Sequence, residues 1–275
     1  MRVAFQGERG ANSEEAVFRI FGDRAEPVPC PDLVQTFDAV VARRADGAVV
    51  PVENSQAGSI NETYDLLLKH DLFITGEYDL RVRHCLMAPA GSTLAGVTRV
   101  YSHPQALAQC DAFLRRHGIE PVVFGDTAGS AKMVAEHRPA GGAAIAPRRA
   151  ADIYHLQILA EGIETNPNNY TRFLVLDPRP APKAERSKTS IVFVVANKPG
   201  TLYQAIGAIA TRGINIAKIE SRPGRERPWD YVFYLDVDGH VDDDAMETAL
   251  ADLRRHTSML RVLGSYPKAE PPAVT

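Results

Sequence analysis

The sequence predicts an α/β fold for the first two thirds of the chain and a smaller β-α-β-β-α-β domain after it. Three observations support this prediction. Short apolar runs alternate with helical patterns up to residue 176, a proline-rich break follows, and the remaining residues show the order strand, helix, strand twice. The 275 residues are also enough for about two domains of typical size.

In the first part, six apolar runs are predicted to be strands: 3–5, 48–52, 97–101, 121–124, 143–146 and 173–176. Helices are predicted at 63–70 and 104–116, where apolar residues recur at intervals of three and four. The alternation favours a largely parallel sheet covered on both faces. In such sheets, ligands bind beyond the carboxyl ends of the strands, so polar residues at those ends are the first candidates for a site.

The clearest break in the pattern is 177–187, where Pro178, Pro180 and Pro182 alternate with other residues and no apolar periodicity remains. This composition is typical of an extended, exposed linker. We therefore predict a first domain at 1–178, a linker at 179–187, a second domain at 188–268 and a loose tail at 269–275.

The second domain is predicted to have strands at 189–196, 214–220, 231–237 and 259–265, with helices at 201–212 and 243–256. This is the ferredoxin-like order. A domain of this size with one helical face leaves a sheet face and two edges uncovered. It therefore favours pairing with a copy of itself, and we expect a homodimer or a homotetramer.

Composition excludes several classes of function. Hydrophobic residues make up 45%, and 31 basic against 34 acidic side chains give a net charge of -3, so no nucleic-acid partner is expected. No apolar run approaches the roughly 18 residues that span a bilayer, and the N-terminus lacks a signal-peptide pattern, so we expect no membrane partner and a cytoplasmic location.

Metal and cofactor signals are missing from the sequence. The three cysteines are far apart, which indicates reduced thiols, and the eight histidines are scattered, so no metal site is expected. Gly7 and Gly10 follow the first strand, but they lack the close glycine pair of a dinucleotide fingerprint. That segment is interpreted as the start of a helix, with Ser13 as its cap, and such a helix end can also receive a carboxylate.

Three predicted strands end in polar residues that lead into a helix. These ends are Glu53-Asn54-Ser55, Ser102-His103-Pro104-Gln105 and 126–130. Each alone is explained by a loop or a helix cap, with His103 more often a surface or capping residue than a catalyst, and Thr127 or Ser130 as caps. Together they suggest a ligand crevice.

A fourth junction, Asn169-Tyr170-Thr171-Arg172-Phe173, resembles the N-x-T-R-F motif of prephenate dehydratases, which convert prephenate to phenylpyruvate in phenylalanine biosynthesis. Segments 51–55, 102–107 and 143–154 resemble that family in the same order. The second domain resembles an ACT regulatory domain. Glu220-Ser221-Arg222-Pro223 matches its E-S-R-P motif, and Gly200-Thr201-Leu202 stands where G-A-L is usual, so that Thr201 is a departure.

The resemblance implies a catalytic domain of two subdomains, like a type 2 periplasmic binding protein, with the active site between them and no cofactor. It also implies L-phenylalanine as an inhibitory effector, bound at ACT interfaces of an oligomer. Thr171 is the first candidate for the group that hydrogen-bonds the departing oxygen, and Glu53, if buried and protonated, is the second and stronger acid. Arg172 either pairs with a substrate carboxylate or ties its strand to a neighbour.

The remaining candidates are grouped by role. The expected prephenate-binding residues are Asn54, Ser55, Ser102, Gln105, Asn169, Arg172 and Phe173, and the expected phenylalanine-binding residues are Gly200, Thr201, Leu202, Glu220, Ser221, Arg222 and Pro223. Two other functions stay open: the same elimination on arogenate, and a non-catalytic amino-acid sensor. A fused chorismate mutase is not expected.

Overall fold

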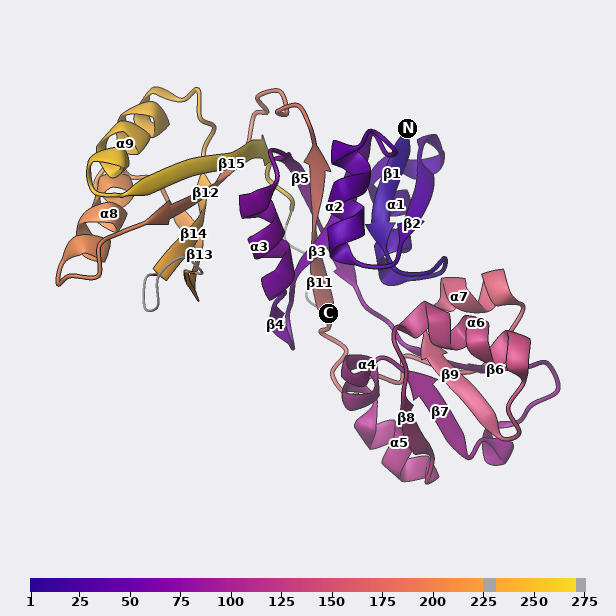
Figure 1. Ribbon diagram of the computed structural model, residues 1–275. Coiled ribbons are helices and arrows are strands. Elements are labelled where there is room, and N and C mark those ends of the chain that lie inside the picture. The colour runs from indigo at the N-terminus through magenta and orange to yellow at the C-terminus, as the bar shows by residue number, and fades with distance from the viewer. Residues whose placement is uncertain (225–230, 271–275) are drawn as a thin grey trace. The chain divides into compact units, whose positions relative to one another are not determined.

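The computed structural model describes residues 1–224 and 231–270, which form two compact units (Figure 1). The first unit contains Met1–His70 and Tyr78–Leu174, and the second contains Asp71–Glu77 and Val175–Glu270. Of the predicted tail, 271–275 lies outside the described residues, as does the segment 225–230 that follows the turn predicted at Pro223-Gly224.

The first sheet has the strand order β2-β1-β3-β11-β5, with β4 pairing to β3. Its strands are β1 (Arg2–Gln6), β2 (Glu26–Cys30), β3 (Gly47–Asn54), β4 (Gly58–Ser59), β5 (Phe73–Arg81) and β11 (Tyr170–Asp177), and its helices are α1 (Asn12–Phe21), η1 (Gly22–Arg24), α2 (Leu33–Val41) and α3 (Asn61–Lys69). Strand β1 runs parallel to both β2 and β3. The division between the two units falls within β5 and β11.

The second sheet of the first unit has the order β10-β6-β9-β7-β8. Its strands are β6 (Cys85–Ala88), β7 (Arg99–Ser102), β8 (Glu120–Val123), β9 (Gly142–Ala146) and β10 (Gln157–Glu161). The helices are η2 (Leu94–Gly96), α4 (Pro104–Gln109), α5 (Asp111–His117), α6 (Thr127–His137) and α7 (Arg148–Tyr154). Separate apolar clusters involve alternate residues of β9, as expected for a strand that is buried on both faces.

The structure corrects the predicted elements in three ways. The second sheet is mixed, because β6 runs antiparallel to both β9 and β10. Strands β2, β4, β5, β6 and β10 were not predicted; β2 carries Pro27 and Pro29, which suit it because it lies at the edge of its sheet. The single helix predicted at 104–116 is two helices, α4 and α5, that meet at Cys110.

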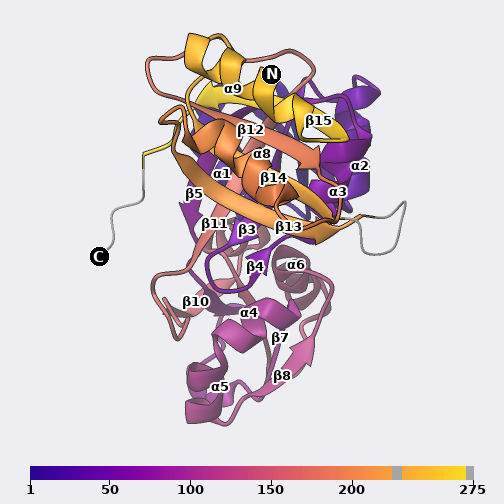
Figure 2. The ribbon, with the colours of Figure 1, turned by 90° about the vertical axis from the view of Figure 1, so that its left-hand side faces the viewer.

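The second unit confirms the predicted β-α-β-β-α-β order. Its elements are β12 (Ser187–Val194), α8 (Thr201–Ala210), β13 (Ile216–Pro223), β14 (Tyr231–Asp238), α9 (Asp244–Arg255) and β15 (Met259–Pro267), and its sheet order is β13-β14-β12-β15. Figure 2 shows α8 and α9 on one face of this sheet. Beneath the helices, Phe193 and Phe233 stack with their ring centroids 5.5 Å apart.

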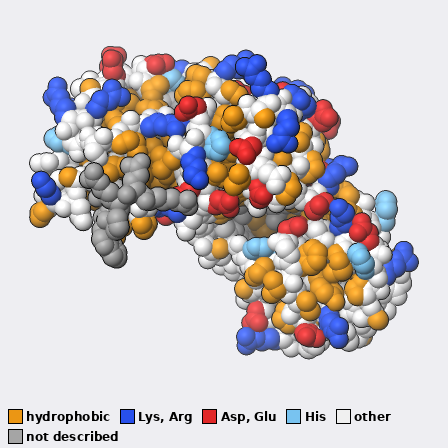
Figure 3. Space-filling view, viewed as in Figure 1, with side chains coloured by type: hydrophobic (Ala, Val, Ile, Leu, Met, Phe, Trp, Pro, Cys, Tyr) orange, Lys and Arg blue, Asp and Glu red, His pale blue; other side chains and the backbone are white. Residues whose placement is uncertain are grey.

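Residues 178–186 before β12 form neither helix nor strand. On the face seen in Figure 3, acidic and basic side chains are interspersed, in agreement with the small net charge. Among the described residues, no helix combines the length and the apolar character needed to cross a bilayer.

Candidate active site

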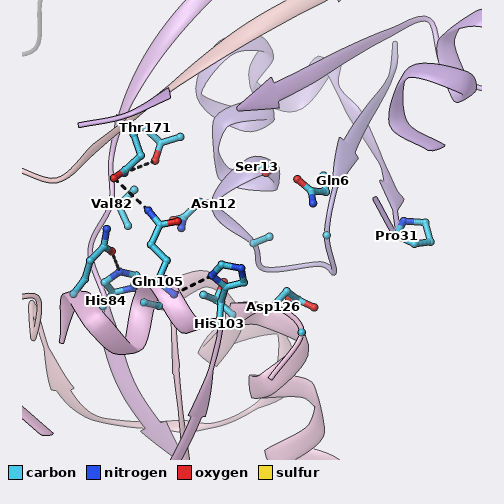
Figure 4. A pocket seen from close by; sticks show the side chains of 17 residues that line it. Gln6, Asn12, Ser13, Pro31, Val82, His84, His103, Gln105, Asp126 and Thr171 are labelled. Atoms are coloured by element: carbon cyan, nitrogen blue, oxygen red, sulfur yellow. Dashed lines mark hydrogen bonds between the residues drawn. The ribbon is translucent and has the colours of Figure 1, made fainter. Parts of the chain in front are cut away.

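A cavity of about 410 Å³ lies within the first unit, at the ends of strands from both of its sheets (Figure 4). Gln6 and Asn54 end β1 and β3, and Thr171 lies at the start of β11. Residues at the starts of helices α1, α4 and α6 also line the cavity. This is the strand-end position that the sequence pattern indicates for a ligand crevice.

The starts of these three helices supply part of the polar character of the cavity. Helix N-termini carry backbone N–H groups without helical partners and a partial positive charge, so they favour anions. None of the residues that line the cavity, all of them described, is Lys or Arg, and Asp126 is the single carboxylate among them. Any anion in this cavity is therefore held by neutral donors and helix ends.

The helix caps differ in part from those predicted. Helix α1 has Ala11 at its N-cap, so Ser13 is not the cap but lies in the first turn. Asp126 caps α6 by accepting a hydrogen bond from the Gly129 backbone N–H at 2.6 Å, which corrects the assignment to Thr127 or Ser130. His103 does cap α4, because its Nδ1 accepts from the Gln105 backbone N–H at 3.2 Å.

A row of hydrogen-bonded side chains, three amides and one histidine, runs along one side of the cavity. Asn54 Nδ2 donates to Asn169 Oδ1 at 2.8 Å and to Thr171 Oγ1 at 3.0 Å. Asn169 Nδ2 donates to Gln109 Oε1 at 3.0 Å, and the same oxygen lies 2.8 Å from His84 Nε2. We call Asn54, Asn169, Gln109 and His84 the amide wall. It joins the end of β3 to the segment before β11 and to α4.

Thr171 is oriented by this wall. Its oxygen accepts from Asn54, so its own O–H can donate to a group in the cavity that it lines. Gln105 lines the same cavity and donates from Nε2 to Asn54 Oδ1 at 3.3 Å. The structure thus brings Thr171, Asn54 and Gln105 to the cavity, with Asn169 directly behind them.

Arg172 and Glu53 are not among the lining residues. Arg172 Nε lies 3.0 Å from Asp79 Oδ1, and Arg172 Nη1 lies 3.7 Å from Glu53 Oε2. Of the two roles considered for Arg172, the structure shows the tie to a neighbouring strand, since Asp79 belongs to β5. The Glu53 side chain remains one third exposed beside this guanidinium.

Three other candidates have structural contacts outside the cavity lining. Ser55 accepts from the Tyr170 backbone N–H at 3.0 Å, which joins the β3 end to β11. Ser102 is fully buried and donates to the Ile145 carbonyl at 2.6 Å, while Phe173 is a core residue.

A charged cluster holds the loop between β1 and α1. The Glu14 carboxylate is fully buried and accepts from the Gly10 backbone N–H and from Arg149 Nε, both at 2.8 Å, and from Arg9 Nε at 3.3 Å. Arg149 also lies over the Phe18 ring, 4.2 Å from its centroid. We call Glu14, Arg149 and Arg9 the charged clamp. It fixes the loop that leads to the cavity-lining start of α1.

His84 and Gln109 line the cavity but carry no signal in the sequence pattern. His84 is 2% exposed, and burial lowers its pKa, although the hydrogen bond to Gln109 opposes this shift. Figure 4 shows His84 on the same side of the cavity as Thr171 and Val82.

The predicted effector residues lie in two segments of the second unit. Gly200 is the N-cap of α8 with φ 86°, and Thr201 Oγ1 donates to the Ala196 carbonyl at 2.6 Å, while Leu202 packs against the apolar core. The other four, Glu220–Pro223, form the end of the edge strand β13.

Two family models match the chain: prephenate dehydratase at residues 3–181 and the ACT domain at residues 189–255. An Arabidopsis thaliana protein named arogenate dehydratase/prephenate dehydratase 2, chloroplastic, is 45% identical over 97% of this chain and 73% of its own length.

Two solved structures are similar over nearly the whole chain. Prephenate dehydratase from Arthrobacter aurescens in complex with L-Phe has a TM-score of 0.90 at 31% identity, covering 100% of this chain and 93% of its own. A protein described as a novel type of quorum quenching acylase has a TM-score of 0.89 at 37% identity, covering 98% of both chains.

Proposed function

Since this chain belongs to the prephenate dehydratase family, and is therefore a dehydratase, we propose that it converts prephenate to phenylpyruvate, carbon dioxide and water. The observation that carries this proposal is the Thr171 hydroxyl. It lines the cavity with its oxygen already accepting from Asn54, so its proton is left for a bound substrate.

The reaction needs little more than positioning and one proton. The bond from the ring to its carboxylate breaks, the electron pair moves into the ring, and the C–O bond to the hydroxyl breaks as the ring becomes aromatic. The departing oxygen receives the Thr171 proton and leaves as water, and Thr171 recovers a proton that comes from solvent. Because aromatisation drives the step, a weak acid held in place suffices.

Glu53 remains the second candidate for the acid. Its side chain lies beside Arg172 and outside the cavity lining, and this position supports ranking Thr171 first. The substrate carboxylates are assigned to the neutral donors of the lining and to the start of α1, whose N-cap Ala11 has no side-chain cap. At α4 and α6, His103 and Asp126 already accept from a first-turn N–H.

The test is phenylpyruvate formation from prephenate by the purified protein. Thr171→Val keeps the side-chain shape and removes the hydroxyl, so kcat should fall by about a hundredfold or more, whereas Thr171→Ser should retain most of the activity. Glu53→Gln is the matching test of the second candidate acid. If Glu53→Gln abolished turnover while Thr171→Val kept it, the ranking of the two acids would be reversed.

Arogenate is the alternative substrate, with an amino group in place of the keto oxygen. The name of the Arabidopsis relative includes both activities, and the substrate choice is a matter of relative kcat/KM. Measuring both substrates with the same preparation decides it. A higher kcat/KM on arogenate would replace prephenate in the proposal and keep the elimination.

We further propose that L-phenylalanine inhibits the enzyme through the second unit. The ACT match at 189–255 and the L-Phe complex of the Arthrobacter relative support this proposal. It includes a homodimer or homotetramer formed through the second unit. Isothermal titration should show phenylalanine binding, and activity should fall over the same concentrations. If the titration showed no heat of binding, or if phenylalanine bound without inhibiting turnover, the feedback model would be wrong.

Acylase activity is a second candidate function, favoured by the 37% identity to the quorum-quenching acylase. Incubation with an N-acyl homoserine lactone, followed by detection of the free acid and amine, tests it. Products that persist in Thr171→Val would place that activity outside the proposed dehydratase machinery.

A further inference from the structure

The amide wall determines the protonation of His84. Asn54 Oδ1 accepts from the backbone N–H groups of Gln56 and Ala57, both at 3.0 Å. Backbone N–H groups can only donate, so this atom must be oxygen and the other Asn54 amide atom must be nitrogen. The orientation of the first amide in the wall is thereby fixed by the main chain.

The remaining amides follow in sequence. Asn54 Nδ2 can only donate, so the Asn169 atom that it contacts is oxygen, and the opposite Asn169 atom is nitrogen. That nitrogen donates to Gln109, so the Gln109 atom at this point is Oε1. An amide oxygen cannot donate, and the hydrogen bond between Gln109 Oε1 and His84 therefore requires a proton on His84 Nε2.

His84 Nδ1 is consequently left with a lone pair, because burial lowers the pKa of the ring and keeps it neutral. Within residues 1–224 and 231–270, Nδ1 is the single buried side-chain polar atom without a hydrogen-bond partner. A buried polar atom without a hydrogen-bond partner costs about 1–3 kcal/mol of stability. A bound ligand that hydrogen-bonds to this atom would remove that cost. The ring belongs to the cavity lining, while Nδ1 itself is buried, so a ligand in the cavity reaches this atom only when a neighbouring group in the wall moves.

The chemistry of prephenate selects that partner. At neutral pH its two carboxylates and its keto oxygen only accept hydrogen bonds, and its ring hydroxyl is its single donor. We propose that His84 Nδ1 accepts a hydrogen bond from the ring hydroxyl of the substrate. The inference rests on the proposed dehydratase function. It makes His84 the group that holds the hydroxyl by its hydrogen, so that the oxygen lone pairs are free to receive the proton from Thr171.

Two substitutions distinguish the roles of the two nitrogen atoms of the His84 ring. In His84→Gln the amide nitrogen can take the place of Nε2 and donate to Gln109, but the acceptor at Nδ1 is lost. The kcat/KM should fall about tenfold, the usual effect of losing one neutral hydrogen bond. In His84→Asn the amide oxygen can take the place of Nδ1, so part of that loss should be recovered.

Arogenate sharpens the kinetic test, because it carries the same hydroxyl and also an ammonium donor. The tenfold loss in His84→Gln should be similar on both substrates. A loss confined to arogenate would place the lone pair against the ammonium and overturn the inference, as would unchanged kinetics on both. His240→Gln is the control, since His240 is also buried but lies in the second unit, and it should leave kcat/KM unchanged.

Nitrogen-15 NMR of histidine-labelled protein tests the inference without a His84 substitution. At neutral pH the His84 signals should show a protonated Nε2 and a bare Nδ1. Adding prephenate to the slow Thr171→Val variant should shift the Nδ1 signal, and an analogue without the hydroxyl should not. A proton on Nδ1, or no shift with prephenate, overturns the inference.

The two proposals fail in distinguishable ways. A folded wild-type protein that turns over neither substrate overturns the dehydratase proposal together with the role of His84. A wild-type protein that turns over prephenate, alongside a fully active His84→Gln variant, overturns the role of His84 alone.

Discussion

The amide wall and the charged clamp hold segments distant in sequence by opposite means. The wall joins Asn54 to Asn169, 115 residues apart, through neutral amides, and the clamp joins Glu14 to Arg149, 135 residues apart, through a fully buried carboxylate. Only the wall contacts the candidate catalytic hydroxyl. A neutral amide fixes both a donor and an acceptor without adding charge beside the reacting atoms, whereas a buried ion pair gives a strong tie with a strong local field.

The comparison predicts that damage to the wall affects turnover more than stability, and that damage to the clamp does the reverse. Asn54→Asp is the sharpest way to break the wall. The new carboxylate oxygen would face Asn169 Oδ1 and Thr171 Oγ1, both of which accept hydrogen bonds from Asn54 in the wild-type protein. We expect kcat/KM to fall by about a hundredfold or more, because small displacements of a catalytic group have effects of this size.

The measurement is steady-state kinetics beside urea unfolding of the same preparation. His240→Gln is the control, since His240 is also buried but lies in the second unit and does not line the cavity. An Asn54→Asp variant with normal kinetics would show that the wall does not orient Thr171.

Glu14→Gln is the matching change in the clamp. It keeps the side-chain volume but removes the charge that faces the two guanidinium groups, and its new N–H₂ group meets donors. Arg9 is well exposed and Arg149 is partly exposed, so the loss should be smaller than for a fully buried pair, about 2 kcal/mol in the free energy of unfolding. Urea unfolding measures it, and kcat should change by less than in Asn54→Asp.

A double-mutant cycle of Glu14→Gln with Arg149→Gln isolates the pair itself. Additive losses in unfolding free energy would mean that Glu14 acts through the Gly10 backbone N–H and not through the arginine.

The third prediction concerns pH and the neutral histidine of the wall. Burial lowers the folded pKa of His84 below the unfolded value of about 6.5, so the unfolded chain binds the proton more readily. The stability that this group contributes is fully present above about pH 6.5 and decreases as the pH falls below it. The urea midpoint of wild type should therefore decrease more than that of His84→Gln between neutral and acidic pH. Parallel pH dependences would contradict this.

The smallest effect is expected at the cysteines. Burial raises the pKa of the Cys85 thiol to about 11, with a further contribution from Glu161, and burial also raises the pKa of Cys110 strongly. Thiolate is the reactive form, so labelling of native protein by a thiol reagent at pH 8 should be far slower than labelling in urea. Fast labelling of either residue in the native protein would show that the second sheet opens locally.

The sequence allowed the strand ends to be predicted, because each residue there belongs to a local pattern. An apolar strand that stops at Asn54, and the run from Asn169 to Arg172, are visible within a few residues. The second unit was predicted almost element by element for the same reason, since apolar periodicity and turn residues alternate regularly in it.

What the sequence could not show are contacts between distant segments. Asp79, the partner of Arg172, lies 93 residues away, and Gln109, the partner of Asn169, lies 60 residues away. His84 and Gln109 follow no capping or strand-end pattern, so only the fold places them in the cavity. Strand β2 was missed because its two prolines contradict a central strand and are tolerated only at an edge.

The absence of Lys and Arg among the described residues that line the cavity affects how a substrate arrives. The attraction of a helix end declines within about its first turn, whereas the field of a whole charge extends to the Debye length, about 8 Å at physiological ionic strength. A dianion approaching this cavity therefore meets no whole positive charge in its lining, and the Asp126 carboxylate there repels it. Because salt screens this repulsion, the groups that line the cavity give added salt no means of slowing association.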